Sequence, residues 1–322
     1  MAYRTLGPSG ARDVWLVLHG GPGSGGNLGL AQPFDLKRQR VILPDQRGSG
    51  ASRPRGSTRS NTLGHLVRDL EALRLHLGLH QWHVLGGSWG ATLALAYAAS
   101  HPTSVGSLVL RGAFDANGGT VRRLFQRFWP DRPPLRAGLG GRPMCHRLSQ
   151  LLHGGALGVT QARVLTQWQG MELDAALAGA RRAARAATDH PHRLQAHQHW
   201  QALQRQRRQL TARAPSQRQL LALRPKYRVQ AHYLARGCGV APGDWTRWLD
   251  RAAGAGIGVQ WVQGGLDAVC PRGIASTAHA RWRALAPAAS QLHLVTGGHL
   301  GTDPGVLAAL RACVAAISQA AP

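Results

Sequence analysis

The sequence predicts an α/β fold in which a doubly wound, mostly parallel sheet carries an inserted helical lid. Short apolar runs alternate with helix-type patterns from residue 14 to residue 112, and strand-type patterns return only after residue 257. The stretch between them is rich in Arg, Gln, Ala and His, has helical spacing and contains no clear strand pattern. Because strands that alternate with helices usually pair in parallel, we expect one sheet, with the insertion lying over one of its edges.

Four apolar runs predict the first strands of this sheet, at residues 14–18, 41–43, 82–85 and 108–110. A helix is expected after the second run. Asn61 or Thr62 can cap its start, Gly78 ends it, and leucines at 66, 70, 73 and 77 share one face. The apolar residues 91–99 predict a second, buried helix.

The sheet is expected to resume with strands at 257–262 and 292–295. A last helix follows, with Asp303 as its cap and Pro304 in its first turn. We therefore divide the chain into a first core segment (1–113), a helical lid (114–250) and a second core segment (251–322).

The charge of the chain is strongly positive. Its 322 residues include 39 Lys and Arg against 14 Asp and Glu, which gives a formal net charge of +25. Only Lys37 and Lys226 are lysines, and the arginines are spread along the chain. We interpret this as a compositional bias without specific nucleic-acid binding, since excess positive charge alone supports only non-specific attraction. An Arg-rich polyanion-binding protein on a vestigial scaffold is the non-enzymatic alternative.

Three features favour a cytoplasmic protein that does not bind membranes. No apolar run approaches the ~20 residues that a bilayer-spanning helix needs. The first residues lack the apolar core of a signal peptide. The four cysteines show neither C-x-x-C spacing nor the density of a disulfide framework.

Residues 86–90 read Gly-Gly-Ser-Trp-Gly, between an expected strand and an expected helix. This is the G-x-S-x-G pattern of a nucleophile elbow, in which small neighbours permit a strained turn that presents a serine hydroxyl. Ser88 is therefore the candidate nucleophile. A serine hydroxyl becomes reactive only when a base removes its proton.

Asp267 and His299 are the candidate partners of Ser88. Each follows an expected strand, and a doubly wound sheet places its site beyond the carboxyl ends of its strands. The order Ser, Asp, His along the chain fits a catalytic triad on such a sheet. His299 would act as the general base, and Asp267 would orient its ring.

The oxyanion of a tetrahedral intermediate needs preorganised N–H donors. We expect them at Trp89, directly after the nucleophile, and at Gly21 in the turn His19–Gly23. A phosphate-binding loop is the competing interpretation of that turn. The turn lacks both the Gly-Lys-Ser/Thr ending and the G-x-G-x-x-G register.

Several motifs together resemble the proline iminopeptidases, or prolyl aminopeptidases, of the α/β-hydrolase superfamily. They are His19–Gly23, Asp45–Gly50, Gly86–Gly90 with the following Ala-Thr-Leu-Ala-Leu-Ala-Tyr-Ala, Leu108–Gly112, and Asp267 with Val269-Cys270-Pro271. The resemblance covers residues 16–114 and the chain from 257 onward. It implies an α/β-hydrolase fold and release of N-terminal proline from peptides, without a metal or cofactor. It also implies two antiparallel strands ahead of residue 14, where only about a dozen residues stand.

The resemblance extends to substrate-binding positions. The segment Trp168–Glu172 is similar to a family Trp-x-x-Trp-Glu segment, so Glu172 is implied to bind the imino group; a solvated helix carboxylate is the alternative. The family pattern Arg-x-Glu-Asn-His-Tyr matches residues 228–233, with Gln230 in the place of the glutamate. Because Gln230 lacks that charge, an esterase or amidase without strict free-amine selectivity is the enzymatic alternative.

Three further residues are implied to border the substrate. Arg111 and Phe114 match positions at the edge of the family's pocket, and Cys270 matches a cysteine that lines it. An inert buried thiol is an equal interpretation of Cys270.

Overall fold

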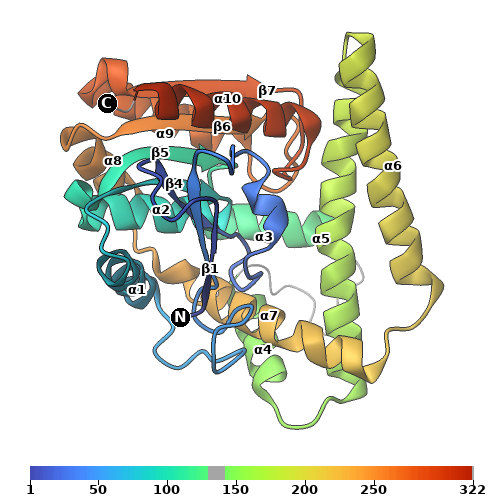
Figure 1. Cartoon of the computed structure of the whole chain (residues 1–322). Helices are drawn as coiled ribbons and strands as arrows, with labels where there is room; N and C mark the ends of the chain where they lie inside the picture. Colours follow the sequence, from blue (N-terminus) through green and yellow to red (C-terminus); the bar gives the residue numbers. More distant parts are fainter. Residues whose placement is uncertain (130–141, 321–322) are drawn as a thin grey trace.

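The structure is a computed structural model and describes residues 1–129 and 142–320 (Figure 1). The described residues form a seven-stranded sheet in the order β1-β3-β2-β4-β5-β6-β7, in which only β1 is antiparallel to its neighbour. The strands are β1 (Tyr3–Leu6), β2 (Val14–Leu18), β3 (Arg40–Pro44), β4 (Trp82–Gly87), β5 (Val105–Arg111), β6 (Gly258–Gly264) and β7 (Ser290–Val295).

Helices cover both faces of the sheet, which makes it doubly wound. Alternate residues of a strand point to opposite faces, and β2 shows this directly. Leu16 and Leu18 belong to the larger core on the face of α2, whereas Trp15 and Val17 pack in the core with α10. The first face carries α1 (Leu63–His76), α2 (Trp89–Ser100), α8 (Asp244–Gly254) and α9 (Arg272–Leu285), and the second carries α10 (Pro304–Ala320).

The remaining helices lie between β5 and β6 in the chain. They are α3 (Gly118–Phe128), α4 (Arg142–His153), α5 (Val159–Ala186), α6 (His190–Ala212) and α7 (Gln217–Ala235). The long helices α5 and α6 lie side by side, and α4 packs against α7 (Figure 1). Short 3-10 helices occur at Leu28–Ala31, Pro102–Ser104, Gly237–Gly239 and Pro287–Ala289.

The structure confirms the predicted fold class and all six predicted strands, with bounds that differ by up to three residues. The predicted start of α1 is also confirmed, since Thr62 caps it and accepts a hydrogen bond from the His65 N–H. The sequence interpretation missed β1 and α9. Of the two antiparallel strands that the resemblance implies, the described chain shows one, β1, which pairs with β3.

No helix within the described ranges combines the length and apolarity that crossing a bilayer requires.

Candidate active site

The turn between β4 and α2 holds Ser88 in a strained conformation. Its φ is 56° and its ψ is −123°, which L-residues rarely adopt. The chain packs too closely here for larger neighbours. A Cβ atom on Gly86 would lie 2.3 Å from the Gly90 carbonyl oxygen, and one on Gly90 would lie 2.3 Å from the Leu18 carbonyl oxygen. Such strain, on the order of 1–3 kcal/mol, is typical of functional turns and fits a nucleophile elbow.

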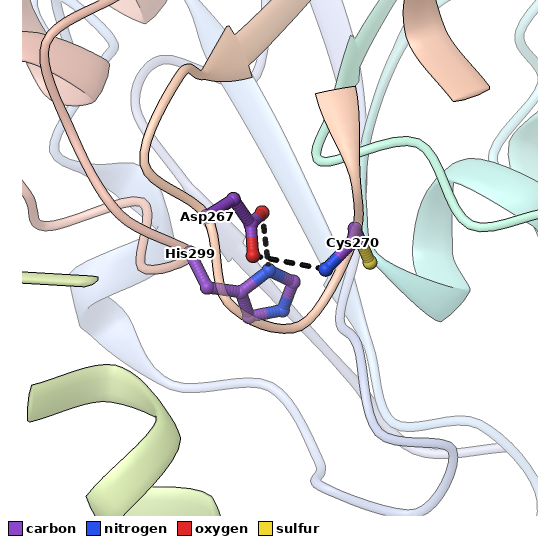
Figure 2. Close-up of side chains that lie close together, drawn as sticks. All are labelled: Asp267, Cys270 and His299. Atoms are coloured by element: carbon purple, nitrogen blue, oxygen red, sulfur yellow. Dashed lines mark hydrogen bonds and ion pairs between the residues drawn. The ribbon is translucent and has the colours of Figure 1, made fainter. Parts of the chain in front are cut away.

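Asp267 and His299 lie together at the ends of β6 and β7. The His299 Nδ1 and Asp267 Oδ2 atoms are 2.8 Å apart, and Asp267 Oδ1 accepts backbone hydrogen bonds from Val269 (2.7 Å) and Cys270 (2.9 Å). In Figure 2 dashed lines join the carboxylate to the imidazole ring and to the Cys270 backbone nitrogen. Burial opposes ionisation of Asp267. The charge of His299 and these hydrogen bonds outweigh it, so the pKa of Asp267 is lowered.

The end of β5 joins Ser88 to this pair. The Ser88 N–H donates to the Arg111 carbonyl (2.8 Å), and Arg111 Nη1 donates to the His299 carbonyl (2.6 Å). At the next residue, Gly112, a Cβ atom would lie 3.4 Å from His299 Cε1 and 3.5 Å from Asp267 Oδ2. Ser88 and His299 both line one cavity of about 470 Å³. The arrangement can support attack by a serine hydroxyl with an imidazole as base.

Arg111 itself is a half-buried cation at this cavity, and partial loss of solvation lowers its pKa. Its hydrogen bond to the His299 backbone means that it fixes the loop that carries the imidazole.

A second loop, from the end of β2, lies against the elbow. A Cβ atom on Gly20 would be 3.4 Å from Ser88 Cβ, and Gly20 and Gly21 line the same cavity. Trp89 is the first residue of α2, where a backbone N–H has no acceptor within its own helix. The expected oxyanion donors, Gly21 and Trp89, therefore belong to two segments that meet at Ser88.

Gln46 ties these two segments together, and the sequence interpretation missed its role. Its N–H donates to His19 Nε2 (3.2 Å), its side-chain amide donates to the His19 carbonyl (2.9 Å), and its Oε1 accepts from the Trp89 indole (2.9 Å). Because His19 Nε2 is an acceptor, the ring proton is on Nδ1, which donates to the Gly20 carbonyl. Burial lowers the pKa of His19, which favours this neutral form.

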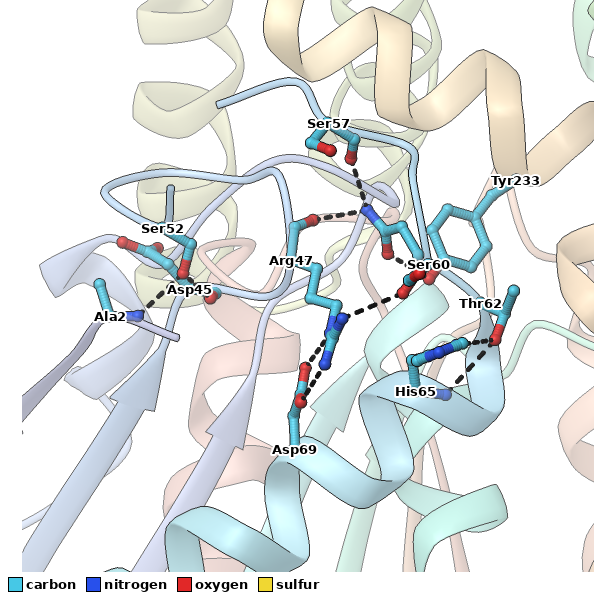
Figure 3. A network of polar contacts seen from close by, with 11 residues as sticks. Ala2, Asp45, Arg47, Ser52, Ser57, Ser60, Thr62, His65, Asp69 and Tyr233 are labelled. Atoms are coloured by element: carbon cyan, nitrogen blue, oxygen red, sulfur yellow. Dashed lines mark hydrogen bonds and ion pairs between the residues drawn. The ribbon is translucent and has the colours of Figure 1, made fainter. Parts of the chain in front are cut away.

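The rest of the Asp45–Gly50 motif braces the loop after β3. Asp45 accepts hydrogen bonds from the Gly26 and Ala51 backbone, and Arg47 forms two hydrogen bonds with Asp69 of α1 (2.5 and 2.7 Å). On the other side of this loop, Tyr233 of α7 reaches it through a hydrogen bond to Asn61 (2.7 Å; Figure 3). Asn61 also donates to the Arg47 carbonyl (2.8 Å), so the motif is connected with α7 through Asn61.

Cys270 is fully buried beside the Asp267–His299 pair. Burial and the Asp267 charge raise the pKa of its thiol well above the ordinary value, although the Arg111 charge and a hydrogen bond with the Ser88 side chain oppose this. Ligand-type atoms of the three residues in Figure 2 lie within 4.8 Å of one another. A protonated thiol is a poor metal ligand and a poor nucleophile, so we interpret Cys270 as an inert neighbour of the site.

The predicted substrate-binding residues Glu172, Gln230 and Phe114 all line the cavity. Gln230 is 8% exposed, and its Oε1 has no hydrogen-bond partner among the described residues. Glu172 is paired. Its Oε2 accepts hydrogen bonds from Lys226 Nζ (2.5 Å) and from the Tyr227 hydroxyl (3.1 Å).

Lys226 is the other residue at the site that the sequence interpretation missed. It also lines the cavity, and it is one of only two lysines in the chain. The rarity of lysine in this chain was the signal that could have identified it. The sequence does not reveal its partner, Glu172, because Glu172 lies 54 residues earlier, on another helix.

Comparison with known proteins places the chain in a family of hydrolases. The family model described as alpha/beta hydrolase fold matches residues 14–304, so the chain belongs to this family. Two solved esterases share the fold, at 18% identity. One is from Exiguobacterium antarcticum (TM-score 0.58, 98% of this chain and 94% of that chain), and the other from Thermogutta terrifontis (TM-score 0.61, 99% and 93%).

The curated relatives are more specific. A proline iminopeptidase of Xylella fastidiosa strain 9a5c is 52% identical over 112 residues, which are 35% of this chain and 36% of that protein. A probable proline iminopeptidase of Streptomyces coelicolor is 39% identical over 170 residues, 48% and 52% of the two chains. These matches confirm the resemblance to proline iminopeptidases. The chain spans about a third to a half of the length of these relatives.

Proposed function

We propose that this protein is a serine hydrolase that releases N-terminal proline from peptides. One observation carries the proposal: the Asp267–His299 hydrogen bond lies at the same strand ends as Ser88, which stands on a strained elbow and shares a cavity with His299. The similarity to proline iminopeptidases supports the choice of substrate.

In the proposed reaction, Ser88 Oγ attacks the carbonyl carbon of the N-terminal proline, and its proton passes to His299 Nε2. Asp267 accepts the Nδ1 proton of His299 in a hydrogen bond and stabilises the imidazolium. Backbone N–H groups of Gly21 and Trp89 stabilise the oxyanion. As the C–N bond breaks, His299 returns the proton to the leaving amine. Water, activated by His299, then hydrolyses the acyl-enzyme and regenerates Ser88.

The cavity offers groups for the proline residue itself. Phe114, Phe125 and Trp168 line it and provide an apolar wall for the pyrrolidine ring. Gln230 Oε1 is a buried acceptor that a substrate N–H could satisfy, and Glu172 is the nearby carboxylate. The proposed mechanism uses neither a metal nor a cofactor.

We further propose that α3 to α7 form the lid over this site. Residues of α3, α5 and α7 line the cavity, whereas α8, which spans the predicted boundary at residue 250, packs on α2 and α9 of the core. A cytoplasmic location belongs to the same proposal. Cys145, Cys270 and Cys313 are free, buried thiols, as suits a reducing compartment.

An esterase or amidase without strict amine selectivity is the second candidate. The observation that favours it is the Lys226–Glu172 ion pair together with Gln230, since these leave the cavity without an unpaired carboxylate among the described lining residues.

Release of aminomethylcoumarin from its prolyl amide tests the main proposal, with Ser88→Ala and N-acetylprolyl-aminomethylcoumarin as controls. We expect hydrolysis that S88A reduces at least ~1,000-fold, as loss of a triad nucleophile does. Folded wild-type protein that releases no fluorophore would overturn the peptidase proposal. Equal turnover of the acetylated substrate would favour the second candidate.

A further inference from the structure

Among the described residues that line the cavity, Glu172 is the only one with a carboxylate. This carboxylate already forms an ion pair with Lys226. We propose that Lys226 is a specificity-determining residue whose ammonium group occupies Glu172 and competes with the cationic amine of the substrate. The inference rests on the proposed hydrolysis at Ser88 and states what limits its selectivity. In this view Lys226 weakens the preference of the wild-type site for an acyl group with a free amine over its uncharged isostere.

The contacts of Glu172 support this competition. Lys226 Nζ and the Tyr227 hydroxyl both bind Oε2, at 2.5 and 3.1 Å, and Lys226 Nζ also lies 4.7 Å from the centre of the Tyr227 ring. The ammonium is therefore held by a carboxylate and an aromatic face. Because Lys226 already balances the charge of this carboxylate, a substrate amine that binds Glu172 competes with Lys226 for it.

The charged side chains that line the cavity also support this competition. Among the described lining residues the permanently charged side chains are Arg111, Lys226 and Glu172, so positive charge exceeds negative charge by one. Gln230 adds an acceptor and no charge. A cationic head group consequently finds the one lining carboxylate among the described residues already paired, unless Lys226 moves away.

Lys226 can move because of the kind of cation it is. Of the 39 basic residues all but two are arginines, yet a lysine occurs here. An arginine would fix the carboxylate in a rigid bidentate pair, whereas a lysine ammonium is a point charge on a flexible chain. The Lys226 and Glu172 side chains are 27% and 30% exposed, so solvent reaches the pair and it can exchange partners. The pair is thus displaceable and sets the strength of amine recognition.

Two substrates of the same shape test the inference. Prolyl-aminomethylcoumarin carries the ring amine, and cyclopentanecarbonyl-aminomethylcoumarin replaces it with a methylene group. We expect wild-type protein to show a kcat/KM for the prolyl substrate that is only a few-fold higher than for the cyclopentanecarbonyl substrate. Lys226→Met should raise the prolyl/cyclopentanecarbonyl ratio by about tenfold or more, because a charged hydrogen bond becomes available to the amine.

Two controls are available because the chain has only two lysines and two glutamates. Lys37→Met removes the other lysine, which is exposed, and should leave the ratio unchanged. The double variant K226M/E172Q should return the ratio to the wild-type value, because no carboxylate is left for the amine. An unchanged ratio in K226M, with hydrolysis still dependent on Ser88, would overturn the inference while the proposed function stands.

Binding measurements separate this inference from the proposed function. Calorimetric titration of prolinamide and cyclopentanecarboxamide into S88A and S88A/K226M reads amine recognition without turnover. The prolinamide preference should rise by about tenfold on loss of Lys226. If the wild-type protein hydrolyses neither coumarin amide, the peptidase proposal fails. The binding ratio still decides the role of Lys226, and an unchanged ratio rejects it.

Discussion

At the residue scale, Gln230 places a neutral amide in the cavity where a glutamate would carry a charge. Its Oε1 lines the cavity, is buried and lacks a partner among the described residues, so it can accept a substrate N–H but cannot balance a cation. We predict that Gln230→Glu raises the prolyl/cyclopentanecarbonyl kcat/KM ratio by about tenfold, since the hydrogen bond to the amine becomes charge-assisted. The neutral variant Gln230→Leu removes the acceptor and should lower the ratio. A ratio that is equal in Q230E and Q230L would show that this position does not contact the amine.

Residue types with a strict local signature were the ones that the sequence could reveal. Ser88 stands in a five-residue motif that the backbone geometry requires, and Asp267 and His299 each follow a strand. Lys226 and Gln46 have no such local signature. Their roles arise from contacts with residues 54 and 27 or more positions away, which only the folded chain brings together.

Among the elements, α1 depends on the other glutamate of the chain. Glu71 accepts hydrogen bonds from Arg74 (2.6 and 3.1 Å), from the Tyr97 hydroxyl of α2 (2.8 Å) and from Ser104 (3.3 Å). The hydrogen bond with Arg74 and, after it, that with Tyr97 outweigh burial and hold the pKa of Glu71 at about 2, against an ordinary 4.5. A carboxyl whose pKa is lower in the folded state stabilises the fold above its unfolded pKa.

We therefore predict that Glu71→Gln lowers the free energy of unfolding by about 1–3 kcal/mol at pH 7, after allowance for solvent screening. The stabilisation by Glu71 is lost as pH falls from about 4.5 towards 2, so the two proteins should converge in that window. Urea denaturation at several pH values, followed by circular dichroism, measures the difference. A gap between the variants that stays constant down to pH 2 would contradict the assigned ion pair.

Helices and strands were predicted correctly where the sequence shows a clear hydrophobic pattern and clear end signals. The α1 helix has a cap, an apolar face and a terminal glycine, Gly78, with a φ of 65°. All three features could be recognised in the sequence. The β1 strand was missed because three of its four residues are exposed, so no buried alternation marks it. The α9 helix was missed because its buried face is mainly alanine, which gives a weak hydrophobic signal beside its arginines.

At the scale of the whole molecule, one carboxylate links α6 to the loop that carries His299. Asp303 Oδ2 accepts hydrogen bonds from the Gly298 and Leu300 N–H groups on either side of His299 (3.1 and 3.2 Å), while its Oδ1 lies 3.4 Å from His199 Nε2 of α6. The sequence indicated only a helix cap at Asp303. Its contact with α6 was not predictable, because periodicity does not say which loop an inserted helix will touch.

The net charge of +25 also acts at this scale. Arginine–carboxylate pairs lie between the β3 loop and α1, within α1, between α5 and α6, within α8, and between α8 and α9, so the described arginines are distributed over many elements. Dispersed charge attracts any polyanion by releasing counterions but reads no sequence. We predict that duplex DNA binds with no sequence preference and that its affinity falls by about 10-fold or more between 50 and 200 mM salt.

Fluorescence anisotropy with two labelled duplexes of unrelated sequence measures this binding, and S88A should bind both as the wild-type protein does. Saturating DNA should leave prolyl-aminomethylcoumarin hydrolysis unchanged. The residues that line the cavity lie on the proposed lid and near the strand ends, where they contact other residues of the chain. A preference between the duplexes above about tenfold exceeds what counterion release provides. If such a preference occurs and Ser88 is unreactive, the positive charge has a function, and a polyanion-binding protein is favoured over a hydrolase.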